Sequence, residues 1–149
     1  MQYHPTVLAL ALVAALLLSL SFFGLALRRL ANAAAFSLAM FCCAAWALAY
    51  ALEILSVPLE AKVVWAKARL IPIALLPVLW FWMTAQYTGR GRLVAQGRIL
   101  LLLIVPALTC AAVALSGEPG RLLRSGYRLV AERPVPTLSY VNGPWFYVH

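Results

Sequence analysis

The hydrophobic positions of this chain fall into four long runs that are separated by short polar stretches. The runs cover about residues 6–27, 33–55, 70–87 and 99–116. A helix that crosses a bilayer needs about 20 mostly apolar residues, so each run is about long enough to do so. The only charged residue within the runs is Glu53, near the end of the second. The pattern predicts an all-α membrane protein with four transmembrane helices.

Prolines modify the third of these helices. Pro58 blocks continuation of the second helix, whereas the segment 59–69 (LEAKVVWAKAR) has a helical pattern again. Pro72 and Pro77 each remove a backbone donor and favour a bend, which either lines a cavity or is a structural kink. We therefore predict helices over about residues 6–27, 33–55, 63–88 and 97–116.

The chain after residue 116 has a different character, because it is rich in Gly, Pro and aromatic residues. Residues 127–130 and 137–141 are predicted as short strands with a turn over 133–136, so that segment 117–149 forms an outer loop or a small β-hairpin. The aromatic cluster at 145–147 is typical of a membrane interface. We expect a fifth helix beyond it, so that residues 1–149 are one membrane region truncated before helix five.

Composition agrees with the membrane assignment. Hydrophobic residues make up 65% of the chain and charged residues 11%, whereas roughly a quarter of a soluble domain is charged. The net charge of +8 indicates arginines that anchor helices at lipid headgroups. Nucleic-acid binding is not indicated, since no basic run with interleaved aromatics lies outside the apolar segments. The three cysteines have no zinc or haem spacing and are expected to pack as small apolar residues.

Orientation depends on the first helix. It is too long for a signal peptide and has no basic residue before it, so we predict a spanning helix with the N-terminus outside. The inner connections then hold Arg28, Arg29, Arg90, Arg92 and Arg98. The outer segments hold Lys62, Lys67, Arg69, Arg121, Arg124, Arg128 and Arg133. A plain count favours the opposite orientation, but the flanks of the first helix carry zero against two basic residues and usually dominate.

Few residues offer chemistry. The chain has no Asp, and its two histidines, His4 and His149, lie near the ends. Acid–base catalysis needs positioned titratable groups, so the sequence predicts no catalytic residue, no metal site and no cofactor. A zinc site from His4, His149 and Glu53 is the weaker alternative, because three scattered residues form no motif.

Glu53 is the main candidate for function, since acids at membrane depth are costly. Trp46, Tyr50 and Glu53 follow helical spacing and are expected to share a face. This face either lines a binding cavity or packs against the third helix, with Glu53 paired to Lys67 or Arg69. If Glu53 contacts a ligand, Glu53→Gln should alter signalling with little loss of folded protein. If the pair is structural, the variant should accumulate poorly.

The order of these features resembles the N-terminal seven-helix membrane region of bacterial sensor histidine kinases, which is also found ahead of diguanylate cyclase domains. The resemblance covers nearly the whole chain apart from a generic first helix. The matching positions are Trp46, Tyr50 and Glu53; Trp65 and Lys67; Tyr87, Thr88 and Gly89; and Gly143, Trp145, Phe146 and His149. One departure follows the fourth helix: residues 116–120 (SGEPG) stand where the family often has a Thr-Asn pair followed by a His.

The resemblance implies a multi-pass protein of the bacterial cytoplasmic membrane that detects a small ligand or a membrane state. It further implies a downstream kinase or cyclase domain, absent from these residues, and pairing with a second copy. Candidate ligand-binding or signalling residues are Trp46, Tyr50, Glu53, Trp65, Lys67, Pro77, Trp80, Trp145 and His149. The alternative is a structural or transporter-like membrane subunit without a sensing role.

Overall fold

The structure is a computed structural model that describes residues 5–27, 29, 32–91, 98–115, 124–130 and 137–142. The described elements are α1 (Pro5–Ala26), α2 (Ala33–Leu55), α3 (Leu59–Ala68), α4 (Leu70–Tyr87), α6 (Arg98–Leu102), α7 (Ile104–Leu115), β1 (Arg124–Val130) and β2 (Thr137–Asn142). Three helical stretches, Pro5–Ala26, Ala33–Leu55 and Leu59–Tyr87, are long and apolar enough to cross a membrane. The predicted membrane-helix fold is confirmed.

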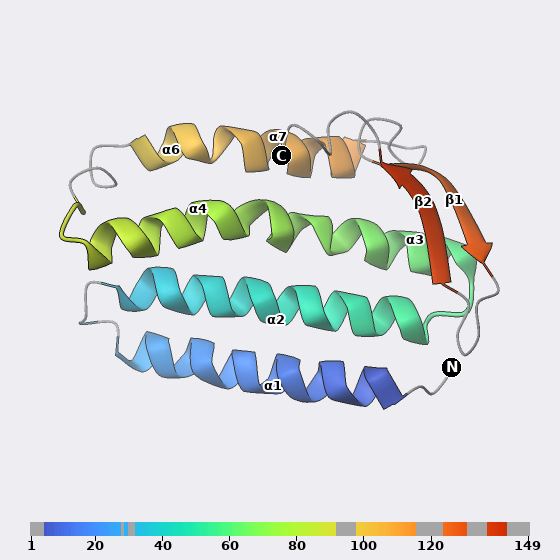
Figure 1. The fold of residues 1–149 in the computed structure, drawn as a ribbon, viewed down its shortest axis with the longest axis horizontal. Coiled ribbons are helices and arrows are strands. Elements are labelled where there is room, and N and C mark those ends of the chain that lie inside the picture. The colour runs from blue at the N-terminus through green and yellow to red at the C-terminus, as the bar shows by residue number, and fades with distance from the viewer. Residues whose placement is uncertain are drawn as a thin grey trace.

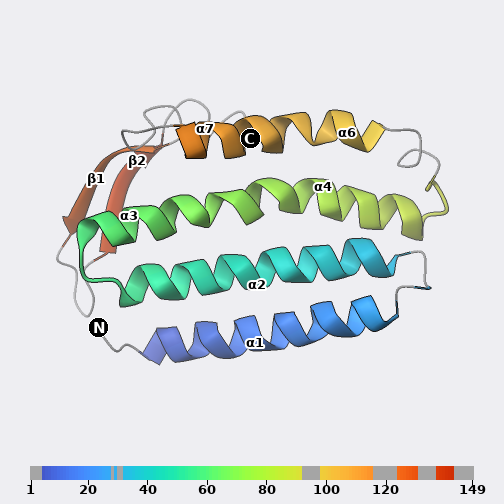
Figure 2. The same cartoon turned by 180° about the vertical axis from the view of Figure 1, so that it is seen from behind.

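The helices form a single layer and not a closed bundle (Figures 1 and 2). α1 packs against α2, α2 packs against α3 and α4, and α4 packs against α7. Neighbours in the layer run in opposite directions, because short connections join each helix to the next. Many large apolar side chains, including Leu12, Leu16 and Phe22, are exposed. Such exposure suits lipid as the surrounding solvent.

Prolines explain where the helical segments are interrupted. α3 begins directly after Pro58, four residues earlier than predicted, and it ends at Ala68. The chain makes a turn at Arg69 before α4 begins, so Pro72 falls in the first turn of α4. Backbone N–H groups in a first turn have no acceptor within the helix, so the N–H that proline lacks costs no helical hydrogen bond there. Pro77 lies inside α4 and is tolerated there. The paired prolines thus accompany a break at Arg69, with α4 continuous beyond it.

The fourth apolar run also contains an interruption that its hydropathy does not reveal. α6 and α7 are separated at Leu103, three residues before Pro106. Pro106 has no backbone N–H and cannot donate to the carbonyl oxygen of Leu102, so the regular pattern of helical hydrogen bonds is interrupted at this point. The segment Arg98–Leu115 still agrees with the predicted span of 97–116.

Small residues bring α1 and α2 close together. A side chain at Gly24 in α1 would collide with the Oγ of Ser37 in α2 and lie 3.1 Å from Cδ1 of Phe36. The hydroxyl of Ser21 donates to the carbonyl oxygen of Ser37 across the interface at 2.9 Å. Close approach through small residues, together with interhelical hydrogen bonds, is how helices associate in lipid, where no hydrophobic force drives them together.

Helix α2 is buried on two opposite faces because it lies in the middle of the layer. With about 100° between successive residues, its buried positions separate into two stripes. The stripe that includes the contact with α1 is Ala33, Ser37, Ala44, Ala47 and Ala51. The opposite stripe is Ala35, Ala39, Cys42, Ala49 and Glu53. Nine of these ten residues are Ala, Ser or Cys, and Glu53 is the exception.

The segment after the helices contains the predicted hairpin. β1 pairs antiparallel with β2, with Arg124 opposite Asn142 and Val130 opposite Thr137, and the register shifts between Ser125 and Arg128. Both predicted strands are confirmed, and β1 begins three residues earlier than expected. The hairpin lies at the end of the layer where α3 begins (Figure 1). The predicted turn over 133–136 lies outside the described residues.

Candidate functional site

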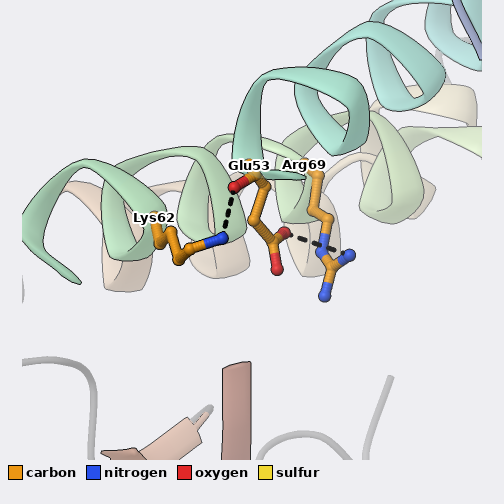
Figure 3. Close-up of polar contacts among 3 residues, drawn as sticks. All are labelled: Glu53, Lys62 and Arg69. Carbon is orange, nitrogen blue, oxygen red and sulfur yellow. Dashed lines mark hydrogen bonds and ion pairs between the residues drawn. The ribbon is translucent and has the colours of Figure 1, made fainter. Parts of the chain in front are cut away.

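Three charged side chains meet where α2 ends and α3 runs into α4. Glu53 comes from the last turn of α2, Lys62 from α3 and Arg69 from the turn between α3 and α4 (Figure 3). Glu53 is 6% exposed and Lys62 is 3% exposed. Charged residues are almost never this buried without partners, so the contacts among them determine what the site can do.

The carboxylate of Glu53 forms an ion pair with Arg69. The distance from Nη1 of Arg69 to Oε2 of Glu53 is 3.1 Å, and the two side chains are 13% and 8% exposed. Of the two partners expected from the sequence, the structure therefore provides Arg69. Attraction is strong in a buried environment, but desolvation opposes it, so such a pair fixes geometry more surely than it adds stability.

Lys62 binds the backbone of α2. Its Nζ donates to the carbonyl oxygen of Glu53 at 3.0 Å. That carbonyl is among the last four of α2, which have no partner within the helix. A lysine ammonium there satisfies an orphan acceptor and also suits the negative end of the helix dipole. Lys62 of α3 thus caps the C-terminal end of α2.

Sequence reasoning missed Lys62. It is seven residues before Arg69, a spacing that places both on one side of a helix, and Ala66 between them is fully buried. Two cations and a small residue thus share one helical face, and an acid lies on the preceding helix. This pattern is the signal that could have identified Lys62. Lys67, the other partner that the sequence suggested for Glu53, lies off this face and is half-buried.

Tyr50 joins the cluster through its ring. The guanidinium carbon of Arg69 lies 5.1 Å from the ring centroid of Tyr50, within the range of a cation–π contact. Tyr50 and Glu53 therefore hold the same arginine, as their shared helical face predicts. Trp46, one turn further from the end of α2, is 43% exposed. Trp65 in α3 is half-buried.

Two other candidates lie elsewhere in the molecule. Pro77 borders a cavity of about 340 Å³ between α4 and the α6–α7 segment, where it lies with Pro106. Trp80 lines a separate groove between α1, α2 and α4. Neither is part of the charged cluster. The structure thus divides the predicted set into a cluster at one end of α2 and two separate hollows along α4.

The remaining candidates were at the chain ends. Trp145, His149 and His4 lie outside the described residues. Within the described part of the chain, no group of three His, Cys, Asp or Glu residues is arranged to hold a metal ion.

Apolar helices of membrane-spanning length, joined by a buried charge cluster at one end, define a multi-pass membrane protein with a polar site near one surface. Residues 7–149 match the family model described as the N-terminal 7TM region of histidine kinase. The chain therefore belongs to this family, the membrane-embedded sensory input region of histidine kinases, which is a non-catalytic region. Its membership implies a membrane context and a downstream kinase domain. No curated protein and no solved structure matches the chain.

Proposed function

We propose that this region is the sensory input module of a bacterial histidine kinase-type protein, in the cytoplasmic membrane with its N-terminus outside. A small ligand or a membrane state acts on the Glu53–Arg69 pair. The downstream domain, a kinase or a cyclase, receives the resulting change in helix positions. The observation that carries this proposal is a buried ion pair that joins two membrane segments at one end of the layer.

The position of the pair supports a relay. Arg69 lies in the turn between α3 and α4, and α4 continues for 18 residues to the other end of the layer. A change in the Glu53–Arg69 distance would therefore alter how α4 leaves this turn. Because α4 also packs against α7, the displacement would reach the following segment. A signal of this kind requires a stimulus that interacts differently with two helix arrangements.

The other residues predicted from the sequence contribute to this proposed site in different ways. Tyr50 holds Arg69 from the side, and Trp46 extends the same face of α2. Trp65 and Lys67 lie on α3, and we propose that they contribute from this helix. Trp145 and His149 follow the hairpin and are proposed to contribute from the outer loop. The pairing of two copies, which the resemblance to histidine kinases implies, is part of the same proposal.

The test uses the full-length protein reconstituted in lipid nanodiscs. Glu53→Gln and Arg69→Gln should change the basal rate of the output domain, measured per molecule of folded, membrane-embedded protein. Glu60→Gln is the matched control, since Glu60 is an exposed acid in the first turn of α3. If both cluster variants match the wild type and the control in output per folded molecule, the pair has no role in signalling.

A further inference from the structure

A groove of about 610 Å³ lies at the other end of the layer, away from the charge cluster. It is bordered by the last turns of α1, the first turn of α2 and the last turns of α4. Its walls include Phe23 of α1, Phe36 of α2, and Trp80 and Tyr87 of α4. Gly24 and Ala33 contribute almost no bulk to it. The hollow therefore results from small residues between aromatic walls, and its lining is almost wholly apolar.

The end of the layer that holds the groove is strongly basic. Arg28 and Arg29 connect α1 to α2, and Arg90 and Arg92 follow α4. Arg29 and Arg90, the two described ones, are exposed. All four acids of the chain lie in or beyond the last turn of α2, in α3 or in the segment after α7, so none neutralises these arginines in the sequence. An apolar groove that ends among arginines complements an anionic amphiphile.

Asn32 provides a polar contact at the mouth of the groove. It borders the groove, and its Oδ1 is buried with no hydrogen-bond partner among the described residues. A buried acceptor without a donor is costly. If the Asn32 side chain turns towards the groove, a hydroxyl group from a bound molecule would satisfy this acceptor, and the headgroup of phosphatidylglycerol carries such hydroxyls.

We propose that this groove binds one acyl chain of an anionic glycerophospholipid, phosphatidylglycerol, whose phosphate lies between Arg29 and Arg90 and whose headgroup hydroxyl donates to Asn32. A second copy of the chain or another helix would fill the apolar part, but it would supply no anion to the arginines. Lipid binding here is independent of the sensing role proposed for Glu53 and Arg69, because it is measured without any kinase output.

The experiment uses the full chain with Trp80 as its only tryptophan, the other four being replaced by Phe. It is reconstituted in phosphatidylcholine that contains a minor fraction of phosphatidylglycerol, and bromine is placed on the acyl chains of one lipid or the other. Brominated phosphatidylglycerol should quench Trp80 well beyond its share of the lipid. A second protein that keeps only Trp46, towards the other end of the layer, should report no preference.

Two variants separate the headgroup from the groove. Attraction of about 1 kcal/mol for each arginine near an anionic surface corresponds to roughly a fivefold change in affinity for each. Arg29→Gln with Arg90→Gln should therefore reduce the preference roughly 25-fold. The matched control is Arg124→Gln with Arg128→Gln in the hairpin, at the opposite end of the layer. Thr84→Phe should fill the groove and abolish the preference, whereas Leu12→Phe on the exposed side of α1 should not.

Equal quenching of Trp80 by the two brominated lipids would overturn the proposal. Protection of Trp80 from both lipids would also overturn it, because the groove would then be covered by protein, either another helix or a second copy. Loss of preference in the hairpin control as large as in Arg29→Gln with Arg90→Gln would show that overall charge, and not this site, selects the lipid.

Discussion

At the scale of single residues, one acid interrupts the small side chains that otherwise line the buried faces of α2, and two cations from the following segment contact it. Glu53 occupies a stripe in which every other buried member is Ala or Cys. Its charge is balanced by Arg69, and its backbone carbonyl is satisfied by Lys62. The side chain and the backbone of one residue are thus held by two different cations, and each contact has a separate consequence.

Removing one charge of the buried pair should be costly, because the other charge remains in a buried position. We expect Glu53→Gln and Arg69→Gln each to lower the free energy of unfolding by about 3 to 5 kcal/mol. The double variant should lose much less than the sum. Unfolding in mixed detergent micelles, followed by circular dichroism, measures all three proteins. Additive losses would contradict direct coupling between the two side chains.

Lys62→Met keeps the length and apolar stem of the side chain but removes the ammonium group. The carbonyl of Glu53 then loses a charged donor, and we expect a loss of about 1.5 to 3 kcal/mol in the same unfolding experiment. Lys67→Met is the control, since Lys67 lies on another side of α3. A loss as large in the control would mean that charge near the surface, and not the cap on α2, stabilises the protein.

The sequence identified Glu53 and named Lys67 or Arg69 as its partner, because an acid within an apolar run is conspicuous and the nearby cations are few, and the structure provides Arg69. It did not identify Lys62. The contact of Lys62 is made with a backbone oxygen, and a backbone acceptor has no signature in the sequence. Trp80 and Pro77 stand out in the sequence by residue type alone, whereas their surroundings depend on how α4 packs against α2 and α7.

At the scale of elements, the interface between α1 and α2 depends on small residues that let the two helix backbones approach closely. Gly24 lies against Ser37, and Ser21 donates to the same residue's carbonyl oxygen. The helix boundaries of both elements followed directly from hydropathy. The break at Leu103 did not, since a run of leucine and isoleucine conceals the effect of Pro106 on the hydrogen bonds of the preceding turn.

Gly24→Val should force α1 away from α2, because the new side chain would occupy the space of the Ser37 hydroxyl. We expect a loss of about 1 to 3 kcal/mol, in the range for overpacking of a tight contact. Ala26→Val, at an exposed position two residues further along α1, should leave stability nearly unchanged. Thermal unfolding in detergent provides the measurement, and equal midpoints for the two variants would show that the interface tolerates the added volume.

At the scale of the whole molecule, the chain is a layer whose two ends differ in character. One end carries the hairpin and the Glu53 cluster, and the other carries the basic connections and the apolar groove. The sequence predicted four helical stretches in the order in which the structure has them, although two of them are interrupted, at Arg69 and at Leu103. It did not predict that they would lie side by side in one layer, because the apolar faces of membrane helices do not distinguish a protein neighbour from lipid.

The proposed orientation is tested by cysteine labelling in intact cells, with Cys42, Cys43 and Cys110 replaced by Ser. Glu60→Cys at the start of α3 should react with a membrane-impermeant maleimide from outside. Arg90 is exposed and lies three residues after the end of α4, so Arg90→Cys should react only once the membrane is permeabilised. Labelling of the two in the reverse order would place the N-terminus inside.

The two buried stripes of α2 also determine which amino-acid changes this helix can accept. Positions such as Ala35, Ala44 and Ala49 have a protein neighbour within reach, and a larger residue there must displace a whole helix. Leu38, Phe41 and Leu48 are exposed between the stripes, so their size is free to vary as long as they remain apolar. A saturation scan of α2 scored by membrane accumulation should therefore reveal two intolerant lines half a turn apart. A helix at the edge of the layer, such as α1, should show only one.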